Sequence, residues 1–112
     1  VYAGDEQGFT GVKEDREHGD DAVRPPFPEK PADLAPYGQP VRQMHQELIG
    51  LRRRHPWLHR ARTRAVMLAN EQYAYEVSDG DRQLTVCLNV ADQPAEVITG
   101  ERLDPHSYRI LE

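Results

Sequence analysis

Four prolines within eight residues are the strongest constraint on what this chain can fold into. The stretch from Arg24 to Pro31 reads Arg-Pro-Pro-Phe-Pro-Glu-Lys-Pro. Proline lacks a backbone N–H and pushes the residue before it toward extended geometry, so this stretch is not expected to be helical. The surrounding residues 1–39 are rich in Gly, Pro, Asp and Glu and contain few large apolar side chains. We therefore expect residues 1–39 to form a long loop, which is either functional or a linker.

The pattern changes after residue 39, where the sequence predicts one amphipathic helix over residues 40–54. Pro40 suits the first helical position. Spacings of three, four and three residues place four apolar side chains on one face: Val41, Met44, Leu48 and Leu51. Pro56 ends the helix near His55. Because a single helix cannot bury such a stripe by itself, we expect it to contact a partner, either the rest of a larger protein or a second copy.

Alternating apolar and polar residues predict β structure over residues 62–112. Tyr73, Tyr75 and Val77 alternate with smaller or polar side chains, and the run from Leu84 to Val90 does the same. Asp79-Gly80 between them indicates a hairpin turn. Together with short runs at 66–68, 95–99 and 108–111, this predicts about five antiparallel strands. The expected fold class is α+β, with a long loop, one helix and a sandwich-like antiparallel β domain.

The overall charge argues against several classes of partner. The net charge is −5, with 14 basic and 19 acidic side chains, whereas nucleic-acid binding needs a basic surface. No apolar run approaches the roughly 20 residues of a membrane-spanning helix, so we expect no membrane partner. Cys87 is the only cysteine. It fits a reducing compartment, and cytoplasmic location is the expectation that follows.

We expect neither a metal nor a cofactor. The acidic residues between Asp5 and Asp21 lack the calcium-loop signature, and the histidines do not form the His-Glu-x-x-His pattern of zinc enzymes. No serine lies in a Gly-x-Ser-x-Gly context, which removes the main signal for a serine nucleophile.

Five segments, in order along the chain, resemble the C-terminal part of the α-amylase family of glycoside hydrolases (glycoside hydrolase family 13). The opening Val-Tyr-Ala-Gly-Asp-Glu-Gln-Gly is similar to the end of the eighth barrel strand, and Arg24-Pro25-Pro26-Phe27 is similar to the loop that follows. Residues 48–58, Leu-Ile-Gly-Leu-Arg-Arg-Arg-His-Pro-Trp-Leu, resemble the eighth barrel helix. Residues 84–90 and 103–108 resemble strands of the family's C-terminal sandwich. The resemblance touches nearly the whole chain.

The resemblance implies a parent (β/α)₈ barrel that cleaves or transfers α-glucosidic bonds, with residues 1–39 as the end of the last strand and a cleft loop. Residues 40–58 would be the last barrel helix and residues 59–112 the C-terminal β domain. The family's three catalytic carboxylates would precede Val1, so no catalytic residue is expected here. Asp5, Glu6 and Arg24 are the candidates for the rim of a cleft that binds an α-glucan or oligosaccharide. Since neighbours on a strand point to opposite faces, only one of Asp5 and Glu6 is expected to face the sugar.

Two other interpretations stay open from the sequence. The chain is alternatively a stand-alone β module that binds carbohydrate or a protein partner without catalysis. A third possibility is a structural protein that self-associates through Val41, Met44, Leu48 and Leu51.

Overall fold

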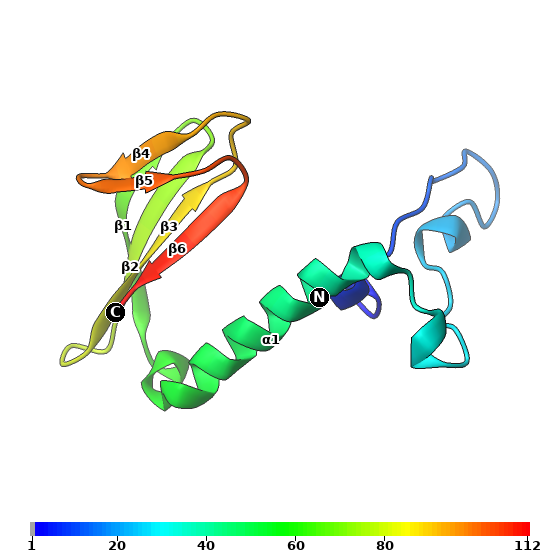
Figure 1. The fold of residues 1–112 in the computed structure, drawn as a ribbon, viewed down its shortest axis with the longest axis horizontal. Coiled ribbons are helices and arrows are strands. Elements are labelled where there is room, and N and C mark those ends of the chain that lie inside the picture. Colours follow the sequence, from blue (N-terminus) through cyan, green and yellow to red (C-terminus); the bar gives the residue numbers. More distant parts are fainter. Residues whose placement is uncertain (1) are drawn as a thin grey trace. The chain divides into compact units, whose positions relative to one another are not determined.

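The computed structural model describes residues 2–112, and the chain divides into two compact units, Val1–Arg54 and His55–Glu112. The first unit contains a long loop with four short 3₁₀ helices and the helix α1. The second contains a fifth 3₁₀ helix and six strands in two antiparallel sheets (Figure 1). This confirms the predicted α+β class with one α-helix and antiparallel β structure.

The loop of the first unit is built from 3₁₀ turns rather than from regular helices or strands. The turns are η1 (Asp5–Gln7), η2 (Asp21–Val23), η3 (Pro31–Asp33) and η4 (Pro36–Gly38). Pro31 and Pro36 open the last two, where a missing N–H costs nothing. Gly38 lies so close to η1 that a Cβ there would come within 2.0 Å of the carbonyl oxygen of Gln7. Only glycine permits this approach of η4 to η1.

The helix α1 spans Gln39–Arg54, one residue longer at its start than the sequence predicts. Pro40 still lies in its first turn, and Pro56 follows its end. Arg52, Arg53 and Arg54 occupy the last turn, where cations complement the helix dipole. Every side chain of Gln39–Arg54 keeps some exposure, including Met44 at 42 % and Leu48 at 37 %. Val41 lies near the loop, since a Cβ at Gly8 would be 3.3 Å from its Cγ2.

The main sheet of the second unit has the strand order β1-β2-β3-β6, with every pairing antiparallel. The strands are β1 (Arg62–Ala69), β2 (Gln72–Ser78), β3 (Gln83–Asn89) and β6 (Ser107–Leu111). The predicted run at 66–68 is the end of a longer strand, because pairing with β2 extends β1 back to Arg62. A bulge at Val66 interrupts this pairing.

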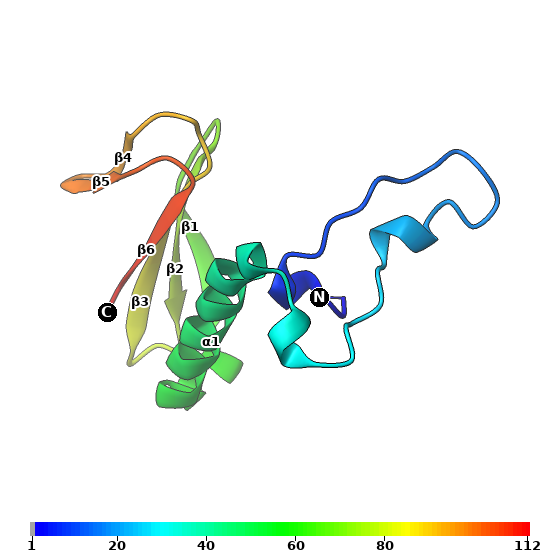
Figure 2. The same cartoon turned by 45° about the vertical axis from the view of Figure 1, so that its right-hand side comes forward.

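Strands β4 (Ala95–Ile98) and β5 (Glu101–Leu103) form a separate two-stranded sheet in the same unit. The sequence predicts one strand over 95–99, whereas the chain turns at Gly100 and returns as β5. Gly100 has a φ of 82°, which favours glycine at this turn. The β4–β5 hairpin lies at the upper end of the main sheet (Figure 2). Val97 and Leu103 from this hairpin pack with Ala74 and Cys87 of the main sheet in a small core.

Candidate functional site

The predicted cleft-rim carboxylates lie in η1, not on a strand. Tyr2 to Gly4 form a turn, and Val1 lies outside the described residues. The strand alternation that was expected to separate the two side chains therefore does not apply. Asp5 Oδ2 accepts the backbone N–H of Tyr2 at 2.6 Å, and Glu6 Oε2 accepts that of Gly4 at 3.1 Å. Both carboxylates stabilise the turn that precedes their own helix.

Arg24, in the middle of the loop, contacts the same turn. Its guanidinium carbon lies 5.5 Å from the centre of the Tyr2 ring, within range of a cation–π contact. The structure thus brings Asp5 and Arg24 together around Tyr2. The nearby carboxylate of Asp20 lies 3.1 Å from Lys13 Nζ. Phe27 packs on Phe9, with ring centres 4.9 Å apart, and so ties the proline-rich stretch to the start of the loop.

Charged residues between Lys13 and Arg24 line an open hollow of about 480 Å³. Two ion pairs, Lys13–Asp20 and Arg16–Glu14, compensate part of its charge. Among residues 2–112, no three His, Cys, Asp or Glu side chains are placed to hold a metal ion. The hollow therefore offers polar contacts of both signs of charge.

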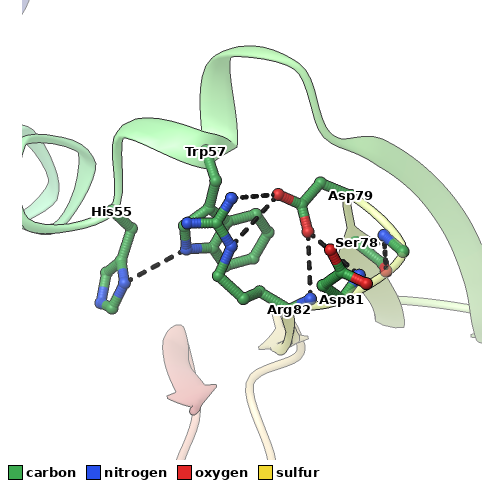
Figure 3. Close-up of polar contacts among 7 residues, drawn as sticks. His55, Trp57, Ser78, Asp79, Asp81 and Arg82 are labelled. Atoms are coloured by element: carbon green, nitrogen blue, oxygen red, sulfur yellow. Dashed lines mark hydrogen bonds and ion pairs between the residues drawn. The ribbon is translucent and has the colours of Figure 1, made fainter.

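In the second unit, His55 and Trp57 lie close to Asp79 and Arg82 of the β2–β3 turn (Figure 3). We call these four residues the polar cluster. Trp57, in η5 (Pro56–His59), is 8 % exposed, and the Arg82 guanidinium carbon lies 5.6 Å from its ring centre. Arg82 donates from both Nε and Nη2 to Asp79 Oδ2, at 3.2 and 2.5 Å. These bonds form a fork between the two side chains of the turn.

The other oxygen of Asp79 holds the turn backbone. Its Oδ1 accepts the N–H of Asp81 at 3.3 Å and that of Arg82 at 3.0 Å. Hydrogen bonding from the Arg82 side chain is the main cause that lowers the pKa of Asp79 below its ordinary value of 3.8. A carboxylate held ionised in this way stabilises a hairpin and is poorly suited to donate a proton.

His55 completes the cluster. The indole N–H of Trp57 donates to His55 Nδ1 at 3.4 Å. Because an indole nitrogen only donates, His55 Nδ1 is the acceptor of this bond. His55 Nε2 lies 3.2 Å from Glu112 Oε2 but is buried without a hydrogen-bond partner. The sequence analysis did not single out His55, Trp57 or Arg82 for this role. The one signal available was that Trp57 is the only tryptophan of the chain.

Asn89 is a second feature that the sequence analysis missed. Its side chain is fully buried, and its amide nitrogen donates to the backbone carbonyls of Gln93 at 2.9 Å and Asp104 at 3.0 Å. Its Oδ1 accepts the N–H of Ala91 at 3.2 Å. Asn89 therefore links the connection after β3 to the turn before β6.

The face of the main sheet opposite the β4–β5 hairpin is apolar, and we call it the outer sheet face. Directly paired residues of adjacent strands share a face, which places two rows of four side chains on it. One row is Leu68, Tyr73, Leu88 and Tyr108; the next is Ala65, Tyr75, Val86 and Ile110. Tyr73 and Tyr75 stack with ring centres 5.3 Å apart. Leu68, at the β1 edge, is 79 % exposed.

Comparison with known proteins gives no assignment: no protein-family model matches the sequence, and no curated protein matches it. Within the described residues, none of the helices has the length and apolar character needed to span a membrane.

Proposed function

We propose that this chain is a non-catalytic, structural part of an α-amylase-like enzyme that acts on α-glucosidic bonds by hydrolysis or transglycosylation. In this proposal α1 is the last helix of the barrel and the β unit is its C-terminal domain. The long loop up to residue 39 shapes the substrate cleft. The rest of the barrel and an α-glucan or oligosaccharide are the partners.

The observation that carries this proposal is the exposed apolar stripe of α1. Met44 and Leu48 keep 42 % and 37 % of their surface exposed, and the neighbouring Ile49 keeps 49 %. Apolar side chains repeated on one face of a helix gain about 25 cal/mol per Å² when they are covered. The ordered resemblance of five segments supports the barrel as the covering structure, because the matching helix segment includes Leu48 and Leu51.

The geometry around Tyr2 supports a shaping role for the loop. Asp5 and Glu6 use their carboxylates on backbone N–H groups, and Arg24 lies over an aromatic ring. Such contacts fix the conformation of a loop more readily than they perform general acid–base catalysis. In a retaining glycosidase two carboxyl groups lie about 5–5.5 Å apart across the bond that is cleaved, and both act on the sugar. The carboxylates of Asp5 and Glu6 are instead bonded to backbone N–H groups of their own turn.

Two measurements test the proposal. The purified 112-residue chain should release no product from maltooligosaccharides or from a chromogenic α-glucoside, and turnover by the chain would contradict the non-catalytic assignment. The reading frame upstream of the Val1 codon should encode three further strand ends that carry an Asp, a Glu and an Asp. A frame without them contradicts the assignment to this family.

The alternative function, a stand-alone β module that binds carbohydrate or protein, is favoured by one observation. The β unit has its own core around Ala74 and Cys87 and its own buried polar link at Asn89. A carbohydrate-binding module should melt at a higher temperature when maltoheptaose is added. An unchanged melting temperature at millimolar maltoheptaose would exclude this sugar as its ligand.

A further inference from the structure

We propose that His55 is a proton-dependent clasp within the second unit, which binds Trp57 when its imidazole is neutral and Glu112 when it is protonated. The two ring nitrogens of His55 face these two partners separately. The indole N–H of Trp57 donates to Nδ1 at 3.4 Å (Figure 3), and Nε2 lies 3.2 Å from Glu112 Oε2. Histidine is the side chain that ordinarily changes its charge between about pH 5 and pH 8, so the solution can select between the partners.

The contact with Trp57 requires a neutral imidazole. An indole nitrogen can only donate, whereas a protonated imidazole carries a hydrogen on each nitrogen and can accept nothing. Protonation of His55 therefore places two N–H groups against each other where one hydrogen bond now lies. Trp57 is only 8 % exposed, so its N–H needs a partner within the protein. The proton thus decides whether Trp57 stays bonded to His55.

The contact with Glu112 has the opposite requirement. Among residues 2–112, Nε2 of His55 is a buried atom without a hydrogen-bond partner, although the carboxylate is near. A buried polar atom in this state is costly. Protonation of the ring turns the same neighbour into an ion pair, because the attraction between two charges depends on their distance more than on alignment. The charged ring therefore has its partner in Glu112.

The other charged groups near His55 and Trp57 do not replace Glu112. Arg82 and Asp79 come from the β2–β3 turn, where Arg82 lies over the Trp57 ring and donates twice to Asp79. His59 belongs to η5 itself and is exposed. Since Glu112 directly follows β6, the protonated clasp joins the start of the second unit to the end of this strand.

Tryptophan fluorescence of the 112-residue chain between about pH 8 and pH 5 follows the exchange, because Trp57 is the only tryptophan. A protonated imidazole quenches a neighbouring indole, so the intensity should fall reversibly toward the acid end. In His55→Gln the side-chain oxygen can still accept the indole N–H but cannot titrate, and the intensity should stay constant. His59→Gln is the matched control, since it removes the other histidine near Trp57 and should respond as the wild type does.

Glu112→Gln tests the second partner. The ion pair exists only while His55 is protonated, so its contribution to stability is present in acid and is lost as the pH rises. At about pH 5 the variant should melt a few degrees below the wild type, as expected for a partly exposed pair, and at about pH 8 the two should melt alike. Glu71→Gln, an exposed change in the β1–β2 turn, should match the wild type at both pH values.

NMR of the ring nitrogens tests the clasp without any substitution. At about pH 8, Nδ1 of His55 should lack a proton, and at about pH 5 both nitrogens should be protonated. Four results would overturn the proposal: a proton on Nδ1 at pH 8, a fluorescence response that persists in His55→Gln, its loss in His59→Gln, or an equal effect of Glu112→Gln at both pH values. None of these measurements depends on the proposed enzymatic family.

Discussion

The side-chain amide of Asn89 donates to the backbone carbonyl of Asp104, fifteen residues further along the chain, at 3.0 Å. The same nitrogen also donates to the carbonyl of Gln93. One fully buried side chain thus fixes both ends of the segment that carries β4 and β5. Since those strands contribute Val97 and Leu103 to the core, Asn89 couples the hydrogen bonding of two turns to the packing of the core.

Replacing Asn89 with Ala should destabilise the β unit by about 2–3 kcal/mol, because it removes several hydrogen bonds and leaves buried groups without partners. For a domain of this size the melting temperature should fall by roughly 10 °C or more. Asn89→Asp should be at least as damaging, since a carboxylate there would face carbonyl oxygens. Gln93→Ala is the control, because it keeps the accepting carbonyl and removes an exposed side chain. Equal melting temperatures for Asn89→Ala and Gln93→Ala would contradict this role.

The Asp79–Arg82 fork predicts a loss of stability in acid. The folded-state pKa of Asp79 is lowered, so its contribution is complete above the unfolded value of 3.8 and is lost as the pH falls through the lower folded pKa. Asp79→Asn should therefore be less stable than the wild type at pH 7, and the difference should shrink by pH 2–3. Urea unfolding at the two pH values measures this.

The control for this acid effect is Asp81→Asn, which retains the backbone N–H that donates to Asp79. It should unfold like the wild type at both pH values. A difference between wild type and Asp79→Asn that stays constant with pH would show that the carboxylate charge is not what holds the turn.

Cys87 should be inert in the folded chain. It is fully buried between Ala74 and Arg109 in the strand register, and burial raises the pKa of its thiol, with a further increase from the charge of Glu101. Because the thiolate is the reactive form, iodoacetamide at pH 8 should label the native protein far more slowly than the chain in urea. Rapid, complete labelling of the folded protein would contradict the position of Cys87 in the core.

The sequence predicts the strands in which apolar and polar residues clearly alternate. It does not predict strands or hydrogen bonds that depend on the backbone of residues far apart in the sequence. Strand β2 is predictable from the alternation of Tyr73, Tyr75 and Val77, because every second side chain of a strand lies on the same face of the sheet. Three-residue β5 has no such pattern, and it exists because β4 offers a pairing edge across Gly100. The side chain of Asn89 donates to main-chain carbonyls. Every residue has such a carbonyl, so the residue types at Gln93 and Asp104 do not predict these hydrogen bonds.

The same limit applies to the candidate residues near the N-terminus. A strand end was expected to place Asp5 and Glu6 on opposite faces. Their short side chains instead reach back to local N–H groups and favour a 3₁₀ turn. The pairing of Arg24 with Tyr2 joins residues 22 positions apart and follows from the path of the loop, which local sequence does not determine.

Trp57 offers a direct probe of the polar cluster, since it is the only tryptophan in the chain. Arg82→Gln removes the cation above its ring and the fork to Asp79, so water should reach the indole and shift its fluorescence to longer wavelength. Arg102→Gln, an exposed change on β5, should leave the spectrum unchanged. Trp57→Ala should cost about 3 kcal/mol or more, as expected for a large buried aromatic. If Arg82→Gln leaves the emission maximum where it is in the wild type, Arg82 does not shield Trp57 and the cluster does not brace the β2–β3 turn against η5.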